Sequence, residues 1–152
     1  MKLLVINGPN MNMLGIRQPD IYGRKTYADL VEYISTACGT RGVEAEFYQS
    51  NHEGAIVDKI QEAYQKADGI VINAAAYTHT SVAIADALAA VGIPAVEVHI
   101  SDVQSREEFR HVSYIKKNCI AVCAGHGFDS YVEAIDVLIE NEKSSKGDPH
   151  HA

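Results

Sequence analysis

Tryptophan is absent from this chain, and cysteine is scarce, with three residues among 152. Cys38, Cys119 and Cys123 are odd in number and show no C-x-x-C spacing, so they predict neither a disulfide framework nor a zinc site. Basic side chains are also few, because 13 Lys and Arg stand against 20 Asp and Glu, for a net charge of −7. That balance argues against a nucleic-acid surface, and it requires any anionic ligand to find a local basic site.

Long apolar runs are absent too. No stretch approaches the roughly 18 residues that a membrane-spanning helix needs, and the opening MKLLVINGPN is apolar for only four residues before Asn7. We therefore expect a cytosolic protein. A content of 47% hydrophobic and 22% charged residues fits one compact core. We predict a single domain over residues 1–142 and a polar, disordered tail over residues 143–152, KSSKGDPHHA.

Short apolar, β-branched runs recur along the chain, and helical patterns lie between most of them. Such alternation indicates a parallel sheet with helices on both faces, because each crossover places its helix over one face. We predict a flavodoxin-like, doubly wound five-stranded parallel sheet in a three-layer α/β/α arrangement. The predicted strands are residues 2–7, 45–50, 69–74, 95–100 and 119–124.

Capping signals give the predicted helix limits. The first helix begins after Thr26 and ends at Gly42, and the second begins at Ser50 with Glu53 in capping-box spacing. The third runs from Thr80 or Ser81 to Gly92, a short fourth has Ser105 and Glu108 in capping-box spacing, and the last runs from about Phe128 to Glu142.

Polar residues gather at one edge of this predicted sheet. Ligands of such folds bind outside the carboxyl ends of the strands, and the segments that follow the strands are NGPNMN, NHE, NAAAYTHTS, HIS and GHGFDS. Because Asn and His also form turns and caps, we interpret Asn7, Asn51 and His126 as structural. His79 and His99 each leave a strand at this edge beside hydroxyl groups, so they are the candidates for function.

Two other kinds of site are conceivable at this edge. A metal site could use His52, His79, His99 and His126, but no H-E-x-x-H or carboxylate-rich spacing accompanies them. We therefore predict no metal and interpret His52 as a surface residue. The NGPN loop occupies the place of a phosphate-binding loop but lacks G-x-G-x-x-G and G-x-x-x-x-G-K-[ST], so nucleotide binding is poorly supported.

Residues 7–25 form an unusually long first loop, and loops of this length are often functional lids. It contains Arg17 and Tyr22. A phenol titrates near 10, so acting as a base at neutral pH needs a shift of roughly three units, about 4 kcal/mol. One neighbouring cation supplies about 1–3 units, and exclusion of water would strengthen the pair. On spacing alone, Tyr22 serving as a base and Tyr22 merely packing the loop remain equal alternatives.

Two arginines lie four residues apart in SREEFRH, on one face of the predicted short fourth helix. Arg106 and Arg110 form either a solvated charge pattern with the adjacent glutamates or a site in which one guanidinium binds a substrate oxygen or carboxylate.

Five segments together resemble type II 3-dehydroquinate dehydratase of the shikimate pathway. They are NGPN, LGIRQPDIYG, INAAAYTHTS, EVHISDV and SREEFRHVSY, in that order, and the resemblance covers residues 2 to about 140. It implies a flavodoxin-like subunit, usually assembled from trimers into a dodecamer. It also implies the elimination of water from 3-dehydroquinate, through an enolate, without metal, cofactor or Schiff base.

The resemblance also implies roles for individual residues. Tyr22 is similar to the base that removes the C2 proton, and Arg17 to the cation that keeps that base deprotonated. His99 is similar to the acid for the departing C1 hydroxyl, with Glu97 as its orienter, and Asn10 would hold a water against the enolate oxygen. The expected substrate contacts are Asn73, His79 and Arg110, the backbone amides of Ile100 and Ser101, and Asp86 reaching a neighbouring subunit.

The chain departs from the family pattern at two positions. Gln18 stands where Glu is expected, which alters the charge of the lid, and Ala85 stands where an Arg often precedes the aspartate, which removes a salt bridge expected near the subunit contact. The rival hypothesis is a flavodoxin-like module that binds a small ligand or flavin without turning it over. The absence of tryptophan removes one common flavin-stacking residue.

Overall fold

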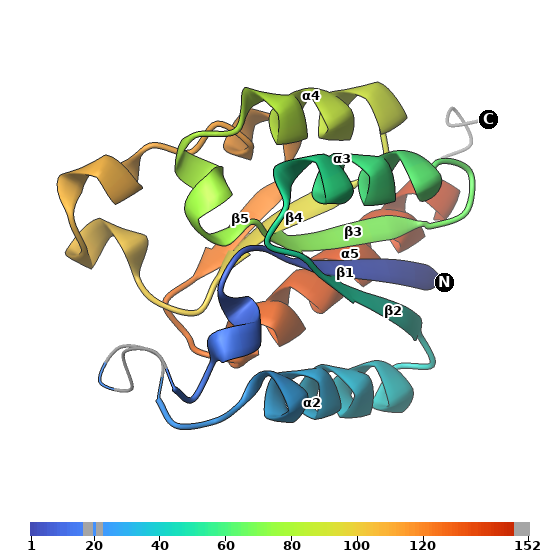
Figure 1. The fold of residues 1–152 in the computed structure, drawn as a ribbon. Helices are drawn as coiled ribbons and strands as arrows, with labels where there is room; N and C mark the ends of the chain where they lie inside the picture. Colours follow the sequence, from blue (N-terminus) through green and yellow to red (C-terminus); the bar gives the residue numbers. More distant parts are fainter. Residues whose placement is uncertain (17–19, 21–22, 148–152) are drawn as a thin grey trace.

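One parallel sheet forms the centre of the molecule (Figure 1). The structure is a computed structural model that describes residues 1–16, 20 and 23–147. Its strands lie in the order β2-β1-β3-β4-β5, and every neighbouring pair is parallel. This order confirms the predicted flavodoxin-like sheet, whose switch point lies between β1 and β3. The strands are β1 (Lys2–Asn7), β2 (Glu44–Gln49), β3 (Gly69–Asn73), β4 (Ala95–His99) and β5 (Ala121–Ala124).

Helices cover both faces of the sheet, as Figure 1 shows. Helices α2 (Tyr27–Thr40) and α5 (Asp129–Gly147) lie on one face, and α3 (Glu53–Glu62) and α4 (Val82–Val91) lie on the other. Strand side chains alternate between faces. Leu3 and Val5 of β1 pack with α2 and α5, whereas Leu4 and Ile6 pack with α3 and α4. The three-layer prediction is therefore confirmed.

Two of the helix limits follow the predicted capping chemistry. Thr26 and Asp29 form a reciprocal capping box at the start of α2. The Ser81 hydroxyl accepts the Ile84 N–H at the start of α4, and Gly92 ends that helix with φ 63°. Each cap satisfies backbone groups that the terminal turns leave unpaired.

The predicted limits of the second and last helices are wrong. His52 is the N-cap of α3, and the Ser50 hydroxyl accepts the His52 N–H, so Ser50 tightens the turn before the helix instead of capping it. The last helix begins at Asp129 and continues past Glu142 to Gly147. Its polar final turns carry Lys143–Glu140 and Lys146–Glu142 ion pairs, which support helix at these spacings. Residues 148–152 of the predicted tail lie outside the described residues.

The connection from β4 to β5 is not the short helix predicted from Ser105 and Glu108. It consists of three 3-10 turns, η3 (Val103–Ser105), η4 (Glu108–His111) and η5 (Lys116–Asn118). The Ser105 hydroxyl donates to the Asp102 carbonyl and ends η3, and Glu108 begins the separate turn η4, so the predicted capping box does not start an α-helix here. The fifth strand also begins later than predicted, because the Cys119 N–H closes η5 by donating to the Lys116 carbonyl.

No helix in the described part of the chain is long and apolar enough to cross a membrane.

Candidate active site

A cavity of about 70 Å³ opens at the carboxyl edge of the sheet, beside the switch point. Its walls come from the loops after β1 and β3 and from the connection between β4 and β5. Because parallel strands end at the same edge, residues far apart in sequence meet there. The lining includes seven residues predicted for the site: Asn10, Asn73, His79, His99, Ile100, Ser101 and Arg110.

The first wall depends on a close approach between two strand exits. The Gly8 N–H donates to the Asn73 carbonyl at 2.8 Å, and a Cβ on Gly8 would lie 2.3 Å from the Ala74 carbonyl oxygen. Only glycine fits this position. Beyond the contact, Asn10 adopts the left-handed conformation (φ 69°), and its N–H donates to the Asn51 side chain. The NGPN loop therefore holds Asn10 at the cavity.

A buried hydrogen-bond network supports this wall from below. The Tyr131 hydroxyl, on α5, donates to Asn7 Oδ1 at 2.5 Å and accepts from Asn73 Nδ2 at 2.9 Å. Asn73 Oδ1 accepts the Ala75 N–H. The network ties together the ends of β1 and β3. The amide of Asn73 is thus engaged within the protein even though Asn73 lines the cavity.

His99 is held by a buried carboxylate. Its Nε2 lies 2.6 Å from Glu97 Oε2, and the two side chains are only 6% and 3% exposed. Because a carboxylate accepts, Nε2–H donates, and Nδ1 is the nitrogen left to exchange a proton. The other carboxylate oxygen, Oε1, accepts from the Ser113 hydroxyl at 2.6 Å. Glu97 thus contacts both the His99 ring and the Ser113 hydroxyl.

His79 lies beside His99, with stacked rings whose centroids are 6.4 Å apart. Its Nδ1 is 2.7 Å from the Val112 carbonyl, so Nδ1–H donates and Nε2 is an acceptor in the neutral ring. Burial lowers the pKa of His79 below its ordinary value, and the nearby His99 and Arg110 act in the same direction. A neutral His79 can accept a hydrogen bond from a ligand hydroxyl.

Both arginines of SREEFRH line the cavity, although they share no α-helix. Arg110 Nε donates to Glu107 at 2.7 Å, which fixes the guanidinium at the cavity rim. These two cations give an anionic ligand a local positive site on a chain whose net charge is −7.

Other predicted site residues lie elsewhere. Asp86 is exposed on α4 and does not line the cavity. Ala85 is buried in the core between α4 and the sheet, so this position holds an apolar contact where a salt bridge was expected. Arg17, Gln18 and Tyr22 lie outside the described residues.

The metal and phosphate alternatives find no matching arrangement. Among residues 1–16, 20 and 23–147, no group of three or more His, Cys, Asp or Glu side chains is placed to hold a metal ion. His52 is exposed at the start of α3, and His126 pairs with Glu133 on the surface. The NGPN loop leads into a single 3-10 turn, η1 (Met11–Met13), and not into an α-helix whose N-terminus could hold a phosphate.

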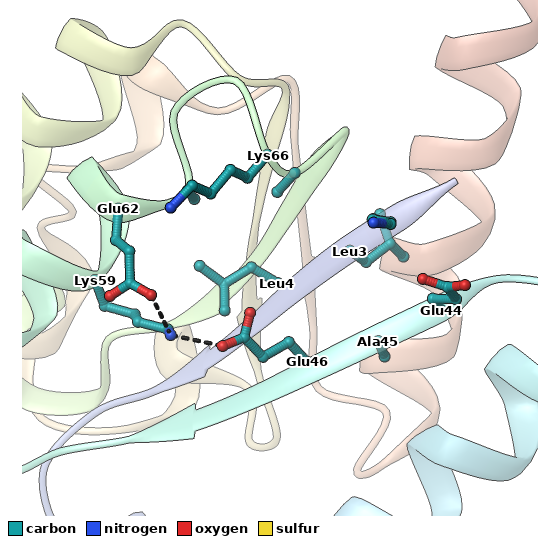
Figure 2. A pocket seen from close by; sticks show the side chains of 11 residues that line it. Leu3, Leu4, Glu44, Ala45, Glu46, Lys59, Glu62 and Lys66 are labelled. Atoms are coloured by element: carbon teal, nitrogen blue, oxygen red, sulfur yellow. Dashed lines mark hydrogen bonds and ion pairs between the residues drawn. The ribbon is translucent and has the colours of Figure 1, made fainter.

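A larger cavity, of about 280 Å³, lies at the opposite edge, where β1 and β2 begin (Figure 2). Its charges neutralise one another. Lys59 Nζ lies between Glu46 and Glu62, at 2.6 Å and 3.3 Å, and Figure 2 shows these side chains turned toward one another over Leu4. This cavity has neither a proton-transfer group like His99 nor an excess of one charge.

Two contributors to the site were missed in the sequence, Ser113 and Tyr131. Ser113 is a single hydroxyl in a connecting segment, and Tyr131 fits the apolar stripe of a helix, so neither has a distinctive spacing. Their importance comes from contacts across the fold, since Tyr131 and Asn7 are 124 positions apart.

Comparisons with known proteins place the chain in a family. Residues 1–139 match the family model described as dehydroquinase class II. The 3-dehydroquinate dehydratase of Caldicellulosiruptor bescii is 54% identical over 91% of this chain and 97% of its own length. The catabolic 3-dehydroquinase 1 of Fusarium vanettenii is 51% identical over 91% of this chain and 96% of its own. The crystal structure of a type II dehydroquinase from Butyrivibrio crossotus superposes with a TM-score of 0.90 at 57% identity, covering 91% of this chain and 97% of that one.

Proposed function

The chain belongs to the class II dehydroquinase family, and on that premise we propose how its side chains divide the dehydration of 3-dehydroquinate to 3-dehydroshikimate. The observation that carries the assignment of the site is the cavity at the carboxyl edge, where His99 with its buried carboxylate lies beside His79 and two arginines. The reaction removes a proton from C2 and the hydroxyl from C1, so it needs a base, an acid and a group that stabilises an enolate.

His99 is the proposed acid. The Glu97 carboxylate fixes Nε2–H, so Nδ1 carries the proton that goes to the departing C1 hydroxyl. General acid catalysis of this kind contributes roughly 10²–10⁴-fold to a rate.

Tyr22 is the proposed base, with Arg17 as the cation that favours its phenolate form. Both fall in the long loop after β1 and outside the described residues. The next residue, Gly23, lines a neighbouring cavity with Ile100 and Ser101, which supports delivery of Tyr22 to the same edge as His99. A base and an acid on opposite sides of the substrate suit an anti elimination through an enolate.

The remaining cavity residues are proposed to bind substrate. Asn10 holds a water against the enolate oxygen, and the backbone amides of Ile100 and Ser101 hold the carboxylate. His79 accepts a substrate hydroxyl at Nε2, because its Nδ1–H is committed to the Val112 carbonyl. Arg110 donates to a second hydroxyl. Asn73 forms part of the cavity wall. Its side-chain amide can bind substrate through the hydrogen-bonding positions that Tyr131 and Ala75 leave unused.

We propose that the active form is a homo-oligomer, a dodecamer built from trimers, in which Asp86 reaches a neighbouring site. Asp86 is exposed on α4, and apolar side chains remain uncovered on the β4–β5 connection and on edge strand β5, including Phe109 at 65%, Val112 at 54% and Val122 at 41% exposed. Light scattering that finds only monomers would contradict this assembly. The three free thiols favour a reducing, cytosolic location.

One assay tests the proposed function. 3-Dehydroquinate is added to purified protein, and ultraviolet absorbance follows the conjugated enone of the product. Tyr22→Phe and His99→Ala should each lower kcat by about 10² or more while the fold is retained. No product from the wild-type protein would overturn the function, and full activity in both variants would overturn the assigned roles.

A further inference from the structure

Ser113 is connected to His99, the proposed acid, through the Glu97 carboxylate. It does not line the cavity, but its hydroxyl donates to Glu97 Oε1 at 2.6 Å, and Glu97 Oε2 accepts from His99. The two oxygens of this buried carboxylate thus each have one partner. A carboxylate that is 3% exposed needs such partners, because a buried polar group left without hydrogen bonds is destabilising.

The direction of the Ser113 hydroxyl is fixed by its own surroundings. The Lys116 N–H donates to Ser113 Oγ at 3.1 Å. Since that bond uses a lone pair of the oxygen, the single hydroxyl proton is directed to Glu97. Ser113 therefore acts as a donor to the Glu97 carboxylate.

The residues on either side of Ser113 are anchored to the segment that carries His79. The Val112 carbonyl accepts from His79 Nδ1, and the Tyr114 N–H donates to the Thr78 carbonyl at 2.9 Å. Ile115, fully buried, holds the segment in the core. Residues 112–114 thus contact His79 through the backbone and the Glu97–His99 pair through the Ser113 side chain.

We propose that Ser113 is a positioning residue for proton donation: it holds the Glu97 carboxylate in place, so that Glu97 fixes the His99 ring by Nε2–H and leaves Nδ1 as the nitrogen available for proton transfer. This inference rests on the proposed role of His99. The other charged or titratable groups that line the cavity are His79, Arg106 and Arg110.

The test compares Ser113→Ala with a matched serine elsewhere. Ser130 is buried, whereas Ser113 is half-buried, and the Ser130 hydroxyl likewise accepts a backbone N–H, that of His126, but Ser130 does not line the cavity. We expect Ser113→Ala to lower kcat roughly tenfold or more, as loss of a hydrogen bond to a charged group implies, with little change in KM. Ser113→Thr, which keeps the hydroxyl, should recover most of kcat.

A pH profile separates positioning from simple loss of structure. In Ser113→Ala the profile of kcat against pH should differ from that of the wild type, because the hydrogen bond that holds the Glu97 carboxylate against His99 is lost. Ser130→Ala should keep the wild-type profile. Equal kcat values and equal profiles in the two alanine variants would overturn the role of Ser113 while leaving the proposed function intact. An inactive wild-type protein would overturn the proposed function itself.

Discussion

Removal of the Tyr131 hydroxyl tests the network beneath the cavity. In Tyr131→Phe the ring stays in the core, but Asn7 Oδ1 loses the Tyr131 donor, and Asn73 Nδ2 keeps only the weak acceptor Met11 Sδ at 3.8 Å. Both amides are buried, at 0% and 4% exposed, so water cannot readily replace the hydroxyl. Burial also raises the pKa of Tyr131 well above its ordinary value, so the neutral phenol is the donor throughout the accessible pH range.

The magnitude follows from those contacts. A net hydrogen bond contributes about 1 kcal/mol, and each buried polar group left unsatisfied costs about 1–3 kcal/mol. We expect Tyr131→Phe to lower the free energy of unfolding by about 2–4 kcal/mol. Asn10 follows the end of β1 and Ala75 follows the end of β3, so movement of these strand ends should disturb the cavity wall. We therefore also expect KM for 3-dehydroquinate to rise.

Denaturant unfolding at one fixed protomer concentration provides the assay, since assembly makes apparent stability depend on concentration. Tyr33→Phe is the matched control, because that hydroxyl donates to Asp129 at the exposed surface. It should cost about 0.5 kcal/mol or less. If the two variants lose the same small amount, the network does not hold the strand exits.

Three further predictions concern other parts of the molecule. Gly8→Ala should destabilise the protein by about 3 kcal/mol or more and suppress activity, because its Cβ would lie 2.3 Å from the Ala74 carbonyl oxygen. Gly54→Ala is the control, because a Cβ at that position meets nothing within 4 Å. Similar melting temperatures for the two variants would refute the close approach. Because the pKa of His79 is lower in the folded protein than in the unfolded chain, the unfolded state binds the proton more readily. The neutral His79 ring therefore contributes to stability above pH 6.5, and that contribution is lost as the pH falls below this value. Melting temperatures from pH 8 to pH 5 should fall more steeply for the wild type than for His79→Gln, and parallel curves would count against a buried neutral ring. Burial raises the pKa of Cys119 to about 12, and it raises the pKa values of Cys38 and Cys123 above their ordinary value. An Ellman titration at pH 8 should therefore label these thiols only after denaturation. Rapid labelling of the native protein would show instead that they are accessible thiolates.

The sheet and its ligand-binding edge could be predicted from sequence because their signals are local. Apolar runs at regular intervals indicate parallel strands, and parallel strands must end at one edge. His79 and His99 each follow such a strand, so their positions in the sequence suffice to place them at the same edge. Thr26 and Ser81 cap their helices as predicted, since the hydroxyl and the N–H it accepts lie within three residues.

Predictions failed where a side chain had a competing local partner. Ser50 has capping-box spacing to Glu53, but its hydroxyl accepts the nearer His52 N–H. Ser105 donates to the Asp102 carbonyl, and the expected helix is replaced by 3-10 turns. The supporting roles of Ser113 and Tyr131 could not be predicted, because each depends on contacts between elements distant in sequence.

The division of labour between base and acid is the central claim, and solvent deuterium exchange tests it most directly. 3-Dehydroquinate is incubated in D₂O with each variant, and NMR follows deuterium entering at C2 above the uncatalysed rate. If Tyr22 forms the enolate and His99 acts only afterwards, His99→Ala should exchange the C2 proton without forming product, and Tyr22→Phe should do neither. Catalysed exchange in Tyr22→Phe, or its absence in His99→Ala, would contradict the account.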